Sequence, residues 1–286
     1  MPSANGPMRS ARSIAGVRPF REVERIMPGT NRMLRILGLF ALERPVITPE
    51  QLIDEFGVSR ASVYRDLGQL TRAGMLERVA DRGYVLGPMV VELDRQVRLA
   101  DPLLQAAQEL PAKLADETGG AVLLCRFHGS KVLCIHQVSG RNPALSVSYQ
   151  RGRAMPLYRG ATSKIILAYL PPAQLERLWA SERQTAVAAG LPDDYAELTR
   201  VLGALRQSGH CVTAGEIDPD AVGLAVALRD AEHLLGSLSV VLPAATLTAA
   251  LRQWVLSRLQ SVAGRIEGRL QDQRDKARAI RKREMP

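Results

Sequence analysis

Hydrophobic residues recur at helical spacing near the start of the chain, between signals that end and begin helices. From Asn31 the apolar positions repeat every three or four residues, which predicts a first helix that ends near Arg44, before Pro45. Thr48 then offers a capping residue ahead of Pro49, a proline suited to the first position of a second helix. Two helices in close succession are therefore expected.

A glycine turn separates the second helix from a third. Gly57 can adopt the left-handed conformation of a tight turn, and Ser59 can cap a third helix that runs to about Ala73. Three residues of this helix form an apolar face: Val63, Leu67 and Leu70. The pattern is typical of a helix-turn-helix.

The remaining face of the third helix is polar and suits the major groove of DNA. Arginine can donate two hydrogen bonds to guanine, glutamine can pair with adenine, and serine or tyrosine can hold phosphate. The candidate DNA-binding residues here are Ser59, Arg60, Ser62, Tyr64, Arg65 and Gln69. The alternative is an ordinary solvated helix face.

A β-hairpin is predicted directly after the third helix. Residues 75–78 and 84–86 are strand-like, and Asp81-Arg82-Gly83 is a turn signal between them. Such a hairpin is a wing, and Arg82 at its tip could contact a minor groove or the phosphate backbone. The alternative for Arg82 is a solvent-exposed turn arginine.

The segment from Leu52 to Leu67, followed by Gly74-Met75-Leu76-Glu77 and Tyr84-Val85-Leu86-Gly87, resembles the DNA-binding domain of IclR-type transcriptional regulators. The resemblance extends over residues 31–270. It implies an α+β fold: an N-terminal winged helix-turn-helix, a linker helix, and a C-terminal α/β effector domain with an antiparallel, GAF- or PAS-like sheet. It also implies that the amphipathic helix predicted at 89–99 supports dimerisation.

The length of 286 residues favours two domains. We expect a flexible basic arm at 1–28, a winged helix-turn-helix at 29–87, a linker helix at 88–101, an effector-binding domain at 102–270 and a basic tail at 271–286. The net charge of +9 is concentrated at the two ends, which suits arms that touch DNA phosphate, although such arms are often only solvated. Without an apolar run long enough for a membrane span or a signal peptide, we expect a cytoplasmic protein with no membrane partner.

Helical and β-prone segments alternate through the C-terminal part of the chain. Strands are predicted at 121–127, 131–138, 145–149, 222–228 and 236–242, with a turn signal at 128–131. Helices are predicted at 103–118, 163–170, 172–179, 193–208 and 247–270. This order favours an antiparallel sheet flanked by helices.

Residues 152–164 resemble the effector-domain signature of the same family. Gly160, Ala161 and Thr162 match a glycine-containing loop that opens a helix, and the resemblance implies that its free backbone amides face the ligand. A helix N-terminus favours a bound carboxylate. The alternative is a glycine turn that caps a helix without a ligand.

Further polar residues complete the predicted effector site. Strand alternation places Ser237 and Ser239 on one face, and the resemblance implies that they line the pocket together with Glu216, with Asp218 as a weaker candidate. Alternating serines are also typical of the solvated side of a sheet. Many relatives carry a polar or thiol residue near what is Val226 here, which suggests a more apolar ligand.

Three cysteines in a chain of this length do not form a disulfide framework. If residues 129 and 130 form a two-residue turn, Cys125 faces Cys134 and Leu123 faces His136. The two cysteines are then either a redox pair or simply packed against each other. Metal-ligand spacing and a nucleophile elbow are missing from the sequence, so we expect no metal, no cofactor and no enzymatic activity.

Together these features predict a sequence-specific DNA-binding transcription regulator, a repressor or an activator, whose operator binding responds to a small-molecule effector. The helix-terminus loop and the hydroxyls favour an organic or aromatic acid, with Arg126, Arg153 or Arg159 as candidate counter-charges. The expected partners are double-stranded operator DNA, the effector and further copies of the chain, as a homodimer or a dimer of dimers. The alternatives are a DNA-binding oligomeric protein without a ligand and an enzyme with a regulatory winged helix.

Overall fold

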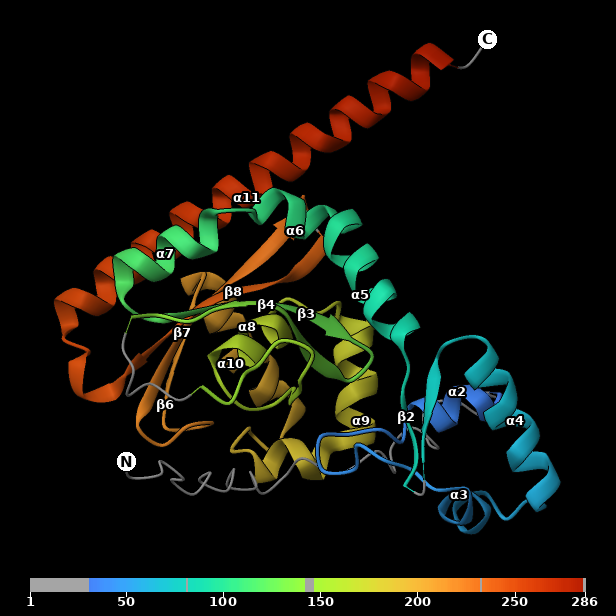
Figure 1. Ribbon diagram of the computed structural model, residues 1–286. Coiled ribbons are helices and arrows are strands. Elements are labelled where there is room, and N and C mark those ends of the chain that lie inside the picture. Colours follow the sequence, from blue (N-terminus) through green and yellow to red (C-terminus); the bar gives the residue numbers. More distant parts are fainter. Residues whose placement is uncertain (1–30, 81, 142–146, 232, 285–286) are drawn as a thin grey trace, which may run out of the picture. The chain divides into compact units, whose positions relative to one another are not determined.

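The computed structural model describes residues 31–80, 82–141, 147–231 and 233–284. The chain divides into two compact units, whose described parts are residues 31–101 and residues 102–284 (Figure 1). Each unit has its own hydrophobic core.

The N-terminal unit contains a winged helix-turn-helix. Its elements are α2, Arg32–Leu37; α3, Pro49–Phe56; α4, Arg60–Arg72; β1, Leu76–Val79; and β2, Gly83–Leu86. Thr48 and Gln51 cap α3 reciprocally, Gly57 ends it at φ 60°, and the hydroxyl of Ser59 caps α4. These are the local signals that predicted the two helices and the turn.

One core unites the helices and the hairpin of this unit. Its buried side chains are Ile36, Ile47, Leu52, Val63, Leu67, Leu70, Leu76 and Tyr84. The backbone of Ile47 also exchanges hydrogen bonds with that of Tyr84, which ties the segment before α3 to the wing.

The first helix is shorter than the sequence pattern predicted. α2 ends at Leu37, and Gly38 follows its last turn. Ala41 and Arg44 then exchange backbone hydrogen bonds in a tight turn. Phe40 packs on the core from this loop, so its helical spacing reflects burial and not helical structure.

A long helix follows the wing. α5, Pro88–Ala100, starts with a proline in its first turn and is followed by Asp101, whose backbone is extended. The structure describes all of α5, and none of its residues is buried.

The C-terminal unit is built on a six-stranded antiparallel sheet in the order β5-β4-β3-β8-β7-β6 (Figure 1). The strands are β3, Ala121–His128; β4, Lys131–Val138; β5, Ala154–Pro156; β6, Cys211–Ala214; β7, Ala221–Asp230; and β8, His233–Pro243. The α+β fold class predicted from the sequence is confirmed.

Helices cover both faces of this sheet. One face packs against α6, Pro102–Ala107; α7, Leu110–Thr118; and α11, Ala249–Glu284. The other packs against α8, Ala161–Ala168; α9, Pro172–Ala188; and α10, Tyr195–Ser208. Strand alternation divides the side chains between the faces: Leu238 and Val240 of β8 lie in the core beneath α11, whereas Ser237 and Ser239, which alternate with them, point to α8.

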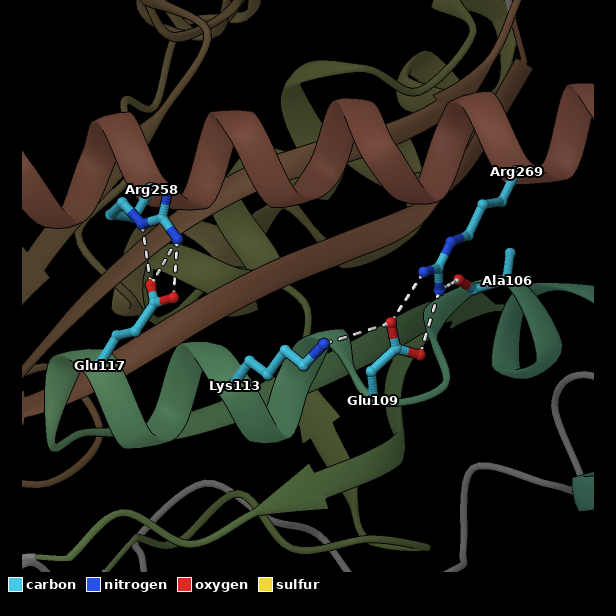
Figure 2. A network of polar contacts seen from close by, with 6 residues as sticks. All are labelled: Ala106, Glu109, Lys113, Glu117, Arg258 and Arg269. Atoms are coloured by element: carbon cyan, nitrogen blue, oxygen red, sulfur yellow. Dashed lines mark hydrogen bonds and ion pairs between the residues drawn. The ribbon is translucent and has the colours of Figure 1, made fainter.

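Two arginines of α11 hold it against α7 and the segment between α6 and α7 (Figure 2). Arg258 donates to both carboxylate oxygens of Glu117, each at 2.8 Å. Arg269 donates to both oxygens of Glu109, at 2.8 and 3.3 Å, and to the carbonyl of Ala106 at 3.1 Å. The hydrogen bond from Arg269 lowers the pKa of Glu109 to about 2.

Several predictions for this unit were wrong in their bounds. The helix predicted at 103–118 is two helices, because Gln108 takes a positive φ of 36° between them. Residues 147–149 are irregular and not a strand, while 145 and 146 lie outside the described residues. The sheet instead ends in the short strands β5 and β6. The helix predicted at 247–270 begins at Ala249 and runs to Glu284 as α11.

The register of the β3–β4 hairpin is partly as predicted. Cys125 faces Cys134, as expected from a two-residue turn. A β-bulge between Leu124 and Cys125 then shifts the register, so His136 pairs with Leu124 and not with Leu123. No helix in the described part of the chain is long and apolar enough to cross a membrane.

Candidate DNA-binding and effector sites

The polar face of α4 is open to solvent, opposite the face that packs on the core. Val63, Leu67 and Leu70 are buried beneath it. Most of the predicted DNA-binding residues are exposed, and Ser62 is half-buried: Ser59, Arg60, Ser62, Tyr64, Arg65 and Gln69. The structure therefore places these six residues along the solvent-facing side of a single capped helix and at its N-cap.

Arg60 is held by its neighbours. Its guanidinium donates to the hydroxyl of Tyr64 at 3.4 Å, lies over the ring at 5.5 Å, and forms an ion pair with Glu50 at 3.8 Å. The hydrogen bond to Tyr64 and the nearby Glu50 raise the pKa of Arg60. The cation is thus positioned over one helical turn of the exposed face.

The hairpin of this unit carries a further basic residue, Arg82. β1 and β2 pair in register from Leu76 opposite Leu86 to Val79 opposite Gly83. Arg82 is exposed, and its backbone N–H closes the turn onto the carbonyl of Val79. Asp81, the first residue of the predicted turn, lies outside the described residues.

The predicted effector loop starts α8, and its hydroxyl groups are engaged within the protein. Thr162 donates to the hydroxyl of Ser239 at 3.0 Å, and Ser237 donates to the carbonyl of Thr162 at 3.2 Å. Ser237 and Ser239 are fully buried. In this conformation they join α8 to β8, and neither faces solvent.

The acidic candidates also bind protein groups. Glu216 accepts a hydrogen bond from the backbone N–H of Gly160 at 2.8 Å and from the ammonium of Lys164 at 2.6 Å. Asp218 accepts from the backbone N–H of Ser148 at 3.0 Å and from its hydroxyl. The carboxylate of Glu216 therefore occupies the N-terminus of α8, where a helix favours an anion.

The loop that carries these acids packs closely on Gly160. Gly160 has φ 81°, and a Cβ there would lie 2.9 Å from the side chain of Ile217 and 3.1 Å from the hydroxyl of Tyr149. Tyr149 also contacts the hydroxyl of Ser163 at 3.1 Å. Burial raises the pKa of Tyr149, which keeps its phenol protonated. Only glycine fits at position 160 with this backbone.

Ala161 and Thr162 are both buried, so the first turn of α8 is packed on all sides except near Lys164. Val226 is buried on the other face of the sheet, in the core beneath α11. The inference of a more apolar ligand from Val226 therefore fails. Ala225 is the neighbouring residue that packs with α8.

Sequence reasoning missed four residues of this site: Ser148, Tyr149, Ser163 and Lys164. Lys164 was detectable, since it follows Gly160 by one helical turn and so lies on the same side of the helix. The contacts of Ser148 and Tyr149 were not, because they join segments far apart in the chain. Of the candidate counter-charges, Arg153 donates to the carbonyl of Ser148 at 3.2 Å.

A winged helix-turn-helix joined to a domain with this sheet and this helix-terminus site defines a DNA-binding regulator with an effector domain. Residues 30–80 match the IclR helix-turn-helix domain, and residues 99–267 match the bacterial transcriptional regulator IclR C-terminal domain. The chain belongs to the IclR family of transcriptional regulators.

Similar proteins agree with this assignment. The HTH-type transcriptional regulator KipR of Bacillus subtilis is 26% identical over 187 residues, which span 65% of this chain and 74% of that protein. XynR of Escherichia coli is 24% identical over 217 residues, 75% of this chain and 86% of that protein.

Solved structures share the fold. An IclR transcriptional regulator from Silicibacter sp. has a TM-score of 0.71 at 22% identity, covering 84% of this chain and 94% of that one. An IclR homologue from Microbacterium hydrocarbonoxydans, complexed with 4-hydroxybenzoate, has a TM-score of 0.70 at 22% identity. The match covers 84% of this chain and 98% of that one.

Proposed function

We propose that α4 reads an operator in the major groove through Ser59, Arg60, Ser62, Tyr64, Arg65 and Gln69, while Arg82 contacts the backbone or the minor groove from the wing. The observation that carries this proposal is the exposed polar face of α4, held opposite the buried Val63, Leu67 and Leu70. In this proposal residues 29–87 are the DNA-binding domain, 88–101 the linker helix and 102–270 the effector-binding domain.

The regulator acts as a homodimer or a dimer of dimers, with one recognition helix per half-site of the operator. α5 supports this part of the proposal. It exposes four large apolar side chains: Val91, Leu93, Val97 and Leu99. Exposed apolar side chains on a linker helix suit packing against the same helix of a second copy.

The effector is a small organic or aromatic acid bound at the start of α8, among Gly160, Ala161, Thr162, Glu216, Asp218, Ser237 and Ser239. The ammonium of Lys164 supplies a cation there. The complex of the Microbacterium homologue with 4-hydroxybenzoate, an aromatic acid, supports this ligand class. Because Ser237 and Ser239 are buried under α8, the first contacts fall to Lys164, Glu216 and the backbone of Gly160.

Such an effector changes DNA binding only if it binds the DNA-competent and DNA-incompetent arrangements with different affinities. Glu216 is the group through which the two arrangements differ in effector affinity. An incoming carboxylate competes with Glu216 for the N–H of Gly160 and for Lys164. The domain binds this acid without converting it.

The first test is binding of the full chain to the DNA that flanks its own gene, with excess nonspecific DNA and at two salt concentrations. Arg60→Ala should weaken operator binding by about 10- to 100-fold, since a bidentate base contact is worth about 1–3 kcal/mol. Arg200→Ala, which removes an exposed arginine of α10, is the matched control and should bind like wild type. Equal, weak and strongly salt-dependent binding by all three proteins would refute base reading by α4.

The second test uses 4-hydroxybenzoate and its neutral analogue 4-hydroxybenzyl alcohol as probes. Calorimetry should show binding of the acid and weaker binding of the alcohol, with the acid losing about tenfold or more in Lys164→Met, because a charge-assisted hydrogen bond is removed. Operator affinity should change when the acid is bound. A ligand-free oligomeric protein would show no heat and no change, and an enzyme would convert the probe.

A further inference from the structure

Cys125 and Cys134 lie directly opposite each other on β3 and β4, and both side chains are fully buried. The Sγ of Cys134 also lies 3.3 Å from the backbone carbonyl oxygen of His136. Opposed residues of an antiparallel pair have Cβ atoms about 4.5–5.5 Å apart, against about 3.5–4.5 Å in a disulfide. A shift of about 1 Å between the strands would therefore allow an S–S bond.

The two thiols are chemically unequal. Burial raises the pKa of Cys125 well above its ordinary range. The neighbouring Cys125 thiol lowers the pKa of Cys134, and the charge of Arg151 acts in the same direction. Cys134 is thus the better nucleophile and Cys125 the resolving thiol.

The third cysteine provides an internal comparison. Cys211 lies in a separate apolar cluster with Ala161, Ile165 and Ala225. Burial raises its pKa to about 12. It is a structural thiol, so the chain carries one unreactive cysteine beside the opposed pair.

Cys134 lies near the end of the paired edge of β4. The pairing of β5 with β4 ends at Leu133, one residue before Cys134. The carbonyl of Cys134 is covered by the N–H of Gly152, at 2.9 Å, from a turn in which Arg151 and Gly152 are exposed. Because the Cys134 side chain lies in the core beside this edge, a small oxidant reaches it when the edge of the sheet opens locally.

We propose that Cys125 and Cys134 form a reversible dithiol–disulfide couple that a hydroperoxide oxidises. The Cys134 thiolate attacks one peroxide oxygen, the O–O bond breaks, and a sulfenic acid and water form. The Cys125 sulfur then attacks the sulfenic sulfur, the S–S bond forms, and a second water leaves. Two thiols lose two electrons and two protons, and hydrogen peroxide is reduced to two waters; an external dithiol reverses the change.

The pair is connected to the start of α8. On its other side, β3 pairs with β8, where Ser237 lies opposite Cys125. The hydroxyl of Ser237 donates to the carbonyl of Thr162 in the first turn of α8. A strand shift at Cys125 would therefore move Ser237 and the first turn of α8. Its effect on effector binding rests on the proposed function, whereas the disulfide chemistry does not.

The test is mass spectrometry of the folded full chain treated with hydrogen peroxide, followed by denaturation and alkylation of the remaining thiols. We expect the loss of two hydrogen atoms per chain, a cross-linked peptide pair that contains Cys125 and Cys134, and an alkylated Cys211. Treatment with dithiothreitol should restore three alkylated thiols. Three alkylated thiols in the peroxide-treated protein, or oxidation of Cys134 to a sulfinic acid without a cross-link, would overturn the proposal.

Single variants assign the two roles. In Cys125→Ser, Cys134 should accumulate as a sulfenic acid that dimedone traps. In Cys134→Ser, Cys125 should remain a thiol under the same peroxide treatment. Cys211→Ser is the matched control and should form the disulfide as wild type does. Equal trapping at both positions would contradict the assigned order of attack.

Discussion

Arg32 donates from Nε to Asp66 Oδ2 at 2.5 Å, and this contact joins the first helix of the winged helix-turn-helix to the buried side of α4. Asp66 lies between Val63 and Leu67 on the buried face of the helix whose other face is proposed to read DNA. The pair therefore links the orientation of the proposed recognition helix to α2.

We predict that Asp66→Asn destabilises the N-terminal unit by about 1–3 kcal/mol, because a charge-assisted hydrogen bond to a buried carboxylate is lost. Hydrogen exchange of α2 and α4 amides should accelerate accordingly. Asp54→Asn, at an exposed position of α3, is the control and should change stability by less than about 0.5 kcal/mol. Unchanged exchange in Asp66→Asn would show that apolar packing alone holds α2.

The Thr162–Ser239 contact predicts a stability effect in the C-terminal unit. Ser239→Ala should cost about 1–2 kcal/mol, since it leaves the buried hydroxyl of Thr162 without this partner. Thr162→Val combined with Ser239→Ala should cost less than the sum of the single changes. Urea unfolding followed by tryptophan fluorescence reports on this unit, because both tryptophans, Trp179 and Trp254, lie in it.

The control for that cycle is Ser257→Ala, at an exposed position of α11. If Ser239→Ala leaves stability unchanged but alters binding of 4-hydroxybenzoate, the hydroxyl serves a ligand and not the packing of α8.

The Glu109–Arg269 pair predicts a pH dependence. The pKa of Glu109 is lowered to about 2 in the folded protein, against 4.5 for the unfolded carboxyl. Its contribution is therefore fully present above pH 4.5 and is lost as the pH falls toward 2. Glu109→Gln should be less stable than wild type at neutral pH, and the difference should shrink between pH 5 and 2.

Tryptophan fluorescence during acid unfolding measures this difference. Glu92→Gln, which removes an exposed carboxylate from α5, controls for the loss of one acidic group. A difference in stability between Glu109→Gln and wild type that stays constant over the whole pH range would contradict a lowered pKa of Glu109 in the folded protein.

The exposed apolar side chains of α5 predict an effect on assembly. Val97, which is 56% exposed in the single chain, should be buried in the proposed dimer. Val97→Asp should weaken dimerisation by about tenfold or more, because a charge would be buried without a partner. Sedimentation velocity over a range of concentrations measures this, with Gln96→Asp, at the adjacent exposed position, as the control. Equal dissociation constants for the two variants would place the dimer contact elsewhere.

The recognition unit was largely predictable from sequence, since its signals act over a few residues. Thr48 and Gly57 begin and end α3, and Ser59 begins α4. The length of α2 was not predictable in this way, because Phe40 gains its burial from a loop that packs on a core formed by distant residues. The spacing of apolar residues indicates which side chains are buried, and a loop can bury side chains at the same spacing as a helix.

The effector site shows the same division. The sequence by itself determined the alternation of Ser237 and Ser239, the glycine at the start of α8 and the opposed cysteines, because a strand period, a turn and a short hairpin are local properties. Only the tertiary structure decided that those serines face α8 and not water, and that Glu216 binds a backbone amide 56 residues away. Such contacts depend on which segments pack together, and that choice is made by the burial of the whole sheet between two layers of helices.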